Sequence, residues 1–200
     1  MEVAVLKVSN IVYGRITNGN RVQYLVDPKG RGDEMAVPES VVLKRWRKRS
    51  LQDYTFSGAR LSSTLWRAVS QSFGRNGIGI CSLVTQQLQD KIDATRDELR
   101  NNGFLKLPSA GTLHAIFSTC GPDRLGKILE RHLSDEHKGL SGVPDLFLFA
   151  KKQNNDQPII AVFVEVKKPR EPVSDVQQSE IDFLNSLNLS ARVFRLSERV

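Results

Sequence analysis

Three charged residues in the second half of the sequence have the types and spacing that chemistry on an anion requires. Asp145 begins the apolar run LFLFA, and Glu165 and Lys167 end the apolar run IIAVFVEV. Side chains alternate along a β-strand, so Glu165 and Lys167 are predicted to share one face while Val166 packs on the other. This pattern holds a carboxylate beside an ammonium group.

A pairing of these two strands would also bring Asp145 close to Glu165. Two carboxylates in a partly buried site are stable mainly when a cation lies between them. Oxygen ligands suit Mg²⁺ or Mn²⁺, and the backbone carbonyl of Val166 is a candidate third ligand. We therefore expect a divalent metal site where the first strand begins and the second ends.

The next helix adds a polar residue to this region. Ser174 can cap a helix that runs to about residue 188. Gln177 and Glu180 fall on its apolar face, whereas Gln178 falls on the polar face; the apolar residues predicted for that face are Val173, Val176, Ile181, Leu184 and Leu187. An inward Gln177 could position a water or an attacked phosphate. Alternatively, the first turns of the helix simply extend past the sheet.

The elements that must position these residues are alternating helices and strands. Hydrophobic periodicity predicts helices over residues 62–73, 83–99 and 122–133, and strands over 146–150, 159–166 and 191–196. His132 falls on an apolar stripe, where a packed, hydrogen-bonded histidine is expected rather than a metal ligand. Short strands are predicted within residues 3–38, with an Asn-Gly hairpin at 17–20.

This pattern predicts an α/β fold with two parts. A small β-rich N-terminal module, ending in a basic segment, is expected over residues 1–57, with a boundary in the stretch 50–58. A mixed central sheet flanked by helices is expected over residues 58–200.

Composition limits the class of protein. The 200 residues are 40% hydrophobic and 26% charged, which excludes disorder as the main state. No apolar run approaches the roughly 20 residues of a membrane span, and the N-terminus lacks the pattern of a signal peptide. We therefore expect an intracellular protein without a membrane partner, in the nucleus of a eukaryote or in the cytoplasm if it is bacterial or viral. Cys81 and Cys120 fit neither a disulfide framework nor a zinc site.

Positive charge is concentrated in the N-terminal half. The net charge is +7, and the first hundred residues carry 16 Lys and Arg against 10 Asp and Glu. The densest run surrounds Trp46 and comprises Lys44, Arg45, Arg47, Lys48 and Arg49. Such a run is expected to be exposed, either as a solvated linker or localisation tract or as a phosphate-binding patch. Lys168 and Arg170, after the second strand, could bind flanking phosphates.

Several of these segments together resemble a known family. Gly142-Val-Pro-Asp145-Leu, Val164-Glu165-Val166-Lys167, Pro169, Ser174, Gln177 and Val193-Phe-Arg195 resemble the VRR-NUC branch of the PD-(D/E)xK nucleases. Residues 117–142, with Gly121-Pro122 and Arg131-His132-Leu133, resemble the Fanconi-associated nuclease group within that branch. The resemblance covers about residues 115–197.

The resemblance implies a restriction-endonuclease-like fold and a structure-selective, Mg²⁺- or Mn²⁺-dependent DNA nuclease of repair or recombination, acting on branched or flapped DNA. It implies Asp145 and Glu165 as metal ligands, Lys167 as a residue that stabilises charge or orients water, and Gln177 as the signature helix residue. It also implies an upstream helical glutamate, for which the candidates are Glu98, Glu130 and the Gln86-Gln87 pair. Glu180 stands where the family usually has an aromatic residue.

Three alternatives stay open. The first is a dimeric Holliday-junction resolvase, as compact members of this branch can be. The second is a catalytically weak DNA-binding module that retains the nuclease fold. The third is an interaction protein whose N-terminal β-module binds another protein.

Overall fold

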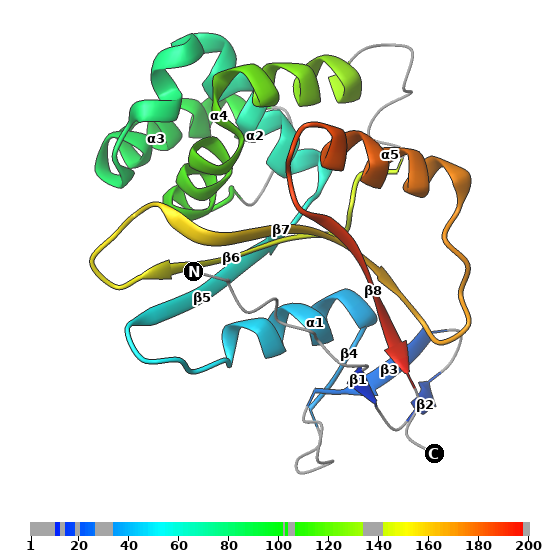
Figure 1. Cartoon of the computed structure of the whole chain (residues 1–200). Coiled ribbons are helices and arrows are strands. Elements are labelled where there is room, and N and C mark those ends of the chain that lie inside the picture. Colours follow the sequence, from blue (N-terminus) through cyan, green and yellow to red (C-terminus); the bar gives the residue numbers. More distant parts are fainter. Residues whose placement is uncertain are drawn as a thin grey trace.

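A five-stranded mixed sheet forms the centre of the molecule (Figure 1). The computed structural model describes residues 11–12, 15–18, 21–26, 34–101, 103, 107–133 and 142–197. In the order β1-β8-β7-β6-β5, the sheet contains β1 (Ile11–Val12), β8 (Ala191–Ser197), β7 (Pro158–Lys167), β6 (Leu146–Lys152) and β5 (Tyr54–Arg60). β5, β6 and β7 are antiparallel, while β8 runs parallel to β7 after the crossover helix α5 (Asp175–Ser186). The predicted α/β fold with a mixed sheet is confirmed.

Helices cover both faces of this sheet. One face packs against α2 (Ser63–Asn76), the 3₁₀ helix η1 (Gly77–Ser82), α3 (Thr85–Asn101), α4 (Ala110–Leu133) and α5, and the other face packs against α1 (Pro38–Arg47) (Figure 1). Residues 146–150 of β6 are therefore buried on both sides, which explains why this strand is apolar without alternation. None of the helices in the described ranges is long and apolar enough to cross a membrane.

The predicted helices in the middle of the chain form, and one of them is longer than expected. α2 and α3 begin one and two residues after the starts of the predicted ranges 62–73 and 83–99, and they end three and two residues later than predicted. α4 begins at Ala110, well before the predicted start at Pro122. Gly121 has a φ of 66° and interrupts the helix, so Pro122 begins the second half, where its missing N–H is tolerated.

The basic run was expected to be exposed, and none of its cations is buried: Arg47 and Lys48 are exposed, and Lys44, Arg45 and Arg49 are half-buried. The sequence did not predict that most of the run belongs to a helix. Residues 38–47 form α1, which buries Val41, Val42 and Trp46 against the sheet. The Trp46 indole N–H donates to the Phe149 carbonyl at 3.0 Å, and its ring packs edge-on against Phe56. Few apolar residues anchor this helix, so the surrounding lysines and arginines mask its periodicity in the sequence.

A second, smaller sheet precedes α1. It contains β2 (Arg15–Asn18), β3 (Arg21–Leu25) and β4 (Met35–Ala36), and β2 and β3 form the predicted hairpin. Tyr24 and Val26 pack in the same apolar cluster as α1. The strand expected at residues 3–8 lies outside the described residues. The boundary predicted between residues 57 and 58 falls within β5, so the two predicted parts share the central sheet.

Candidate functional site

The carboxylate of Asp145 lies where β6 begins, level with the end of β7. The antiparallel register sets Leu146 opposite Val164, which brings the preceding residue, Asp145, to the last residues of β7. Its Oδ2 accepts a hydrogen bond from the Val166 N–H at 2.8 Å. The strand pairing that the sequence predicted is therefore present.

Gly142 explains how the segment before Asp145 reaches this place. Its φ is 81°, in the left-handed region that favours glycine. A Cβ at this position would lie 2.8 Å from the carbonyl oxygen of Val176, at the start of α5. Only glycine allows the chain to pass this close to the helix before it enters β6.

Glu165 and Lys167 form a buried ion pair at the end of β7. Their exposed fractions are 3% and 4%, and Lys167 Nζ lies 3.0 Å from Glu165 Oε1. Val166 packs on the opposite face, in the apolar cluster of α1. The alternation predicted for these three residues is confirmed. Glu171, in the following loop, is a second and more distant partner of Lys167 at 3.8 Å.

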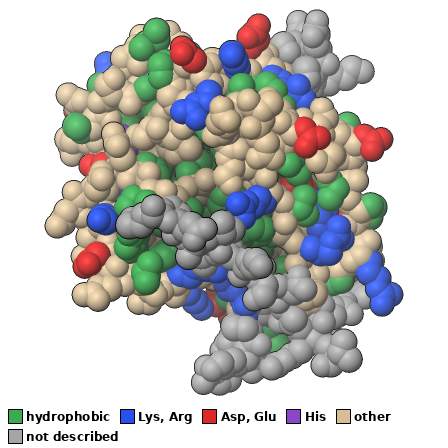
Figure 2. Space-filling view, in the orientation of Figure 1, with side chains coloured by type: hydrophobic (Ala, Val, Ile, Leu, Met, Phe, Trp, Pro, Cys, Tyr) green, Lys and Arg blue, Asp and Glu red, His purple; other side chains and the backbone are tan. Residues whose placement is uncertain are grey.

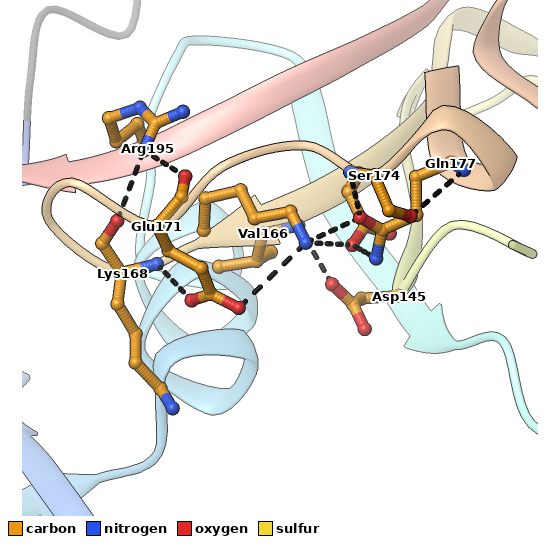
Figure 3. A network of polar contacts seen from close by, with 9 residues as sticks. Asp145, Val166, Lys168, Glu171, Ser174, Gln177 and Arg195 are labelled. Carbon is orange, nitrogen blue, oxygen red and sulfur yellow. Dashed lines mark hydrogen bonds and ion pairs between the residues drawn. The ribbon is translucent and has the colours of Figure 1, made fainter. Parts of the chain in front are cut away.

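Gln177 faces this pair from the first turn of α5 (Figure 3). Its Oε1 accepts from Lys167 Nζ at 2.7 Å and from the backbone N–H of Ser174 at 3.0 Å, while its Nε2 donates to Glu165 Oε1. Gln178 is exposed and bonds Asp182. The helical phase predicted for both glutamines is correct, but Val176, assigned to the apolar face, is 53% exposed.

The electrostatics of the site disfavour two free carboxylates. Desolvation raises the pKa of Asp145, opposed by its hydrogen bond from Val166. Desolvation also raises the pKa of Glu165, and the negative charge of Asp145 raises it further, opposed by Lys167. Two converging carboxylates with one ammonium leave negative charge uncompensated. Such a donor set suits a hard divalent cation.

A comparison with known protein families shows the family of this chain. Residues 83–197 match the VRR-NUC domain. The chain belongs to the VRR-NUC family. No curated protein matches its sequence significantly.

Two solved structures of paFAN1, each bound to 5′-flap DNA with a gap, share the fold of this VRR-NUC protein. Their TM-scores are 0.52 and 0.53 at 17% identity, and the matches cover 81% and 84% of this chain. They cover 35% and 36% of the paFAN1 chain, so this protein spans about a third of its length. The sequence resemblance to the VRR-NUC branch is confirmed.

The cations expected to bind phosphates lie in two places, one at the end of α1 and one just after β7. Every member of the basic run contacts its own chain: Lys44 and Lys48 pair with Glu34, Arg45 donates to the Val26 carbonyl, Arg47 donates to the Gly58 carbonyl, and Arg49 lies over the Trp46 ring. Lys168 and Arg170 are exposed just after β7. Figure 2 shows positive side chains at several separate places on one face of the molecule.

Sequence reasoning missed two charged residues near the site. Arg60 ends β5 and Glu39 lies in the first turn of α1; they form an ion pair at 3.3 Å. Glu39 raises the pKa of Asp145, and Arg60 lowers it. Both residues lie far before Asp145 in the sequence. The pairing of β5, which ends in Arg60, with β6 brings them close to Asp145. No spacing in the sequence signals this.

The expected upstream glutamate has no counterpart among the candidates. Glu98 pairs with Arg75 between α3 and α2, and Gln87 caps the start of α3, so neither contact includes a residue of the site. Glu130 is exposed on α4. In the described part of the chain, no three His, Cys, Asp or Glu side chains are grouped to hold a metal ion. The Val166 carbonyl thus stays the predicted third ligand.

A second buried polar cluster joins α5 to α4. Glu180 accepts from His132 Nε2 at 2.7 Å and from Arg131 Nε at 2.8 Å, and His132 stacks on Trp66. His132 and Glu180 are each 1% exposed. The packed, hydrogen-bonded histidine predicted from the sequence is confirmed. Because Gln177 lies one turn before Glu180, this cluster holds the helix that carries it.

Proposed function

We propose that this VRR-NUC protein is a divalent-metal-dependent nuclease that hydrolyses phosphodiester bonds in DNA and selects its substrate by DNA structure. One observation carries the proposal. Asp145 at the start of β6, Glu165 and Lys167 at the end of β7, and Gln177 in the first turn of α5 lie together at one end of the sheet. Glu165, Lys167 and Gln177 contact one another, and Asp145 accepts from the Val166 N–H between Glu165 and Lys167. A carboxylate pair with an adjacent lysine is the chemistry that phosphodiester hydrolysis needs.

The donor set fits Mg²⁺ or Mn²⁺. Asp145 and Glu165 supply oxygen ligands whose pKa values are raised by burial, so the charged forms gain stability from a cation. The Val166 carbonyl would be the third protein ligand. The metal ion would neutralise phosphate charge and lower the pKa of an attacking water.

Lys167 and Gln177 lie next to the proposed metal ligands. Lys167 Nζ is fixed by Glu165 and Gln177, so its charge is held where a phosphate would gain negative charge during hydrolysis. Gln177 positions both members of the pair through its amide. Lys168 and Arg170 are exposed beside the strand end and would contact flanking phosphates, which fix register without reading bases.

The substrate is proposed to be branched or flapped DNA. The paFAN1 structures that share the fold hold 5′-flap DNA with a gap, and this supports testing that class of substrate first. A purified chain should be tested on a gapped 5′ flap, a four-way junction, a plain duplex and a single strand. Each reaction is run with Mg²⁺, with Mn²⁺ and with EDTA.

We expect cleavage of the flap with either metal ion and none with EDTA. Glu165→Ala should bind the same DNA without cutting it. Preferential cleavage of the four-way junction by a species with the mass of a dimer would favour the resolvase alternative. DNA binding without cleavage at any metal concentration would overturn the nuclease assignment and leave a binding module.

A further inference from the structure

Arg60 lies beside the proposed site but on the opposite face of the sheet. It is the last residue of β5 and stands opposite Leu146, and the next N–H, of Leu61, donates to the Asp145 carbonyl at 2.9 Å. The backbone therefore fixes Arg60 one residue pair away from Asp145. Its side chain belongs to the face of α1, since Phe56 of the same strand packs in that cluster.

The first turn of α1 holds the Arg60 guanidinium. Nη2 donates to Ser40 Oγ at 2.9 Å and contacts Glu39 Oε2 at 3.3 Å. Within the residues that the structure describes, Nε and Nη1 have no hydrogen-bond partner, and the side chain is 49% exposed. Three N–H groups of an oriented guanidinium thus remain available to a ligand.

The charge of Arg60 is not needed for folding. Exposed ion pairs such as that with Glu39 contribute little to stability, typically about 0–1 kcal/mol. The strand pairing nevertheless places the cation near the site, since Arg60 is paired with Leu146, the residue after Asp145. A planar, always charged guanidinium is the side chain that matches phosphate oxygens best.

We propose that Arg60 binds a backbone phosphate of the DNA strand that crosses the end of the sheet at Asp145, while Ser40 orients its guanidinium. This inference rests on the proposed function and deepens it. It assigns a DNA contact to the α1 side of the sheet, opposite the face of Lys167. Because the ligand is a phosphate, Arg60 contributes affinity and register but no base preference.

The test uses the full chain and flap DNA in which single phosphates around the cleavage site are replaced, one at a time, by uncharged methylphosphonates. Wild type should lose about tenfold in kcat/KM at one position, which is the order expected for a lost charged hydrogen bond. Arg60→Ala should lose about the same factor on unmodified DNA, retain kcat at saturating DNA, and become insensitive to the methylphosphonate at that position. Arg60→Lys should lie between the two.

Arg75→Ala is the matched control, because Arg75 is also about half exposed and pairs with Glu98 away from the sheet. It should behave as wild type, and thermal unfolding should show that both alanine variants are folded. Two results would overturn the proposal: undiminished kcat/KM in Arg60→Ala, or a methylphosphonate penalty as large as in wild type at every position. If wild type cleaves no DNA, the proposed function fails instead, and the same scan read as DNA affinity still decides the role of Arg60.

Discussion

Two groups of charged residues stand out in the sequence, and the structure uses them in opposite ways. The basic run Lys44 to Arg49, at the end of α1 and just after it, is the densest cluster of positive charge in the chain, yet each of its cations contacts the protein itself. The site residues Asp145, Glu165 and Lys167 are few and come from two strands, yet they lie together where β6 begins and β7 ends. Charge density alone does not tell what a cation binds, whereas spacing along strands that pair does.

The cause of this difference is what surrounds each group. Burial lowers the pKa of Arg45 to about 10, because its guanidinium lies between α1 and the small sheet and donates to the Val26 carbonyl. The run thus satisfies backbone carbonyls at the edge of the α1 core. At the site, β6 and β7 place two carboxylates together, and Lys167 balances only part of their charge.

The largest expected effect is the loss of cleavage when Lys167 is removed. Lys167→Ala should lower the single-turnover rate on flap DNA by roughly 10²-fold or more, as for other lost electrostatic stabilisers. Lys168→Ala is the matched control at saturating DNA, where loss of the flanking-phosphate contact proposed for its exposed side chain lowers affinity but not the single-turnover rate. A Lys167→Ala rate within a few-fold of the Lys168→Ala rate would show that the buried charge of Lys167 contributes no more to cleavage than an exposed charge beside it.

The next effect tests the structural role of the basic run. Arg45→Ala and Arg47→Ala each remove a donor from a part-buried carbonyl and should each lower the free energy of unfolding by about 1–3 kcal/mol. Lys44→Ala and Lys48→Ala, whose partner Glu34 is half exposed, should change it by less than about 1 kcal/mol. Urea unfolding measures all four. If all four variants change the free energy of unfolding by equally small amounts, the basic run is a solvated surface that is available to bind DNA.

These two groups also show what the sequence can predict. Apolar runs and their alternation predict β6, β7 and the shared face of Glu165 and Lys167, because period-two patterns fix which side chains are neighbours. The capping serine and the helical period predict that Gln177 points inward. The sequence does not predict α1, because few apolar residues, chiefly Val41, Val42 and Trp46, anchor it among many cations. The sequence does not predict that Arg60 and Glu39 lie near the site, because a long-range strand pairing positions them.

A smaller effect separates the two neighbouring glutamines of α5. Gln177→Ala removes hydrogen bonds to both charged residues of the site and should lower the cleavage rate by about tenfold. Gln178→Ala, which loses only an exposed bond to Asp182, should cleave at the wild-type rate. Similar rates for the two variants, measured on the same DNA, would show that the Gln177 contacts are dispensable.

The smallest effect concerns stability without metal. Because the pKa of Asp145 is raised on folding, its contribution favours the folded state below the unfolded pKa, about 3.9, and is lost as pH rises through the folded pKa. Asp145→Asn abolishes this titration. In EDTA at neutral pH the variant should therefore melt above wild type, with the gap closing toward pH 4. A variant that melts below wild type across this range would contradict the electrostatics described for the site.

The most direct measurement of the central claim, that the start of β6 and the end of β7 form a divalent cation site, is calorimetric titration of Mn²⁺ into the purified chain without DNA. Wild type and the Lys44→Ala control should bind with the same affinity. Asp145→Asn and Glu165→Gln, each lacking one carboxylate ligand while keeping its shape, should bind far more weakly or not at all. Unchanged Mn²⁺ affinity in both of these variants would show that the metal ion, and with it the chemistry, belongs elsewhere in the molecule.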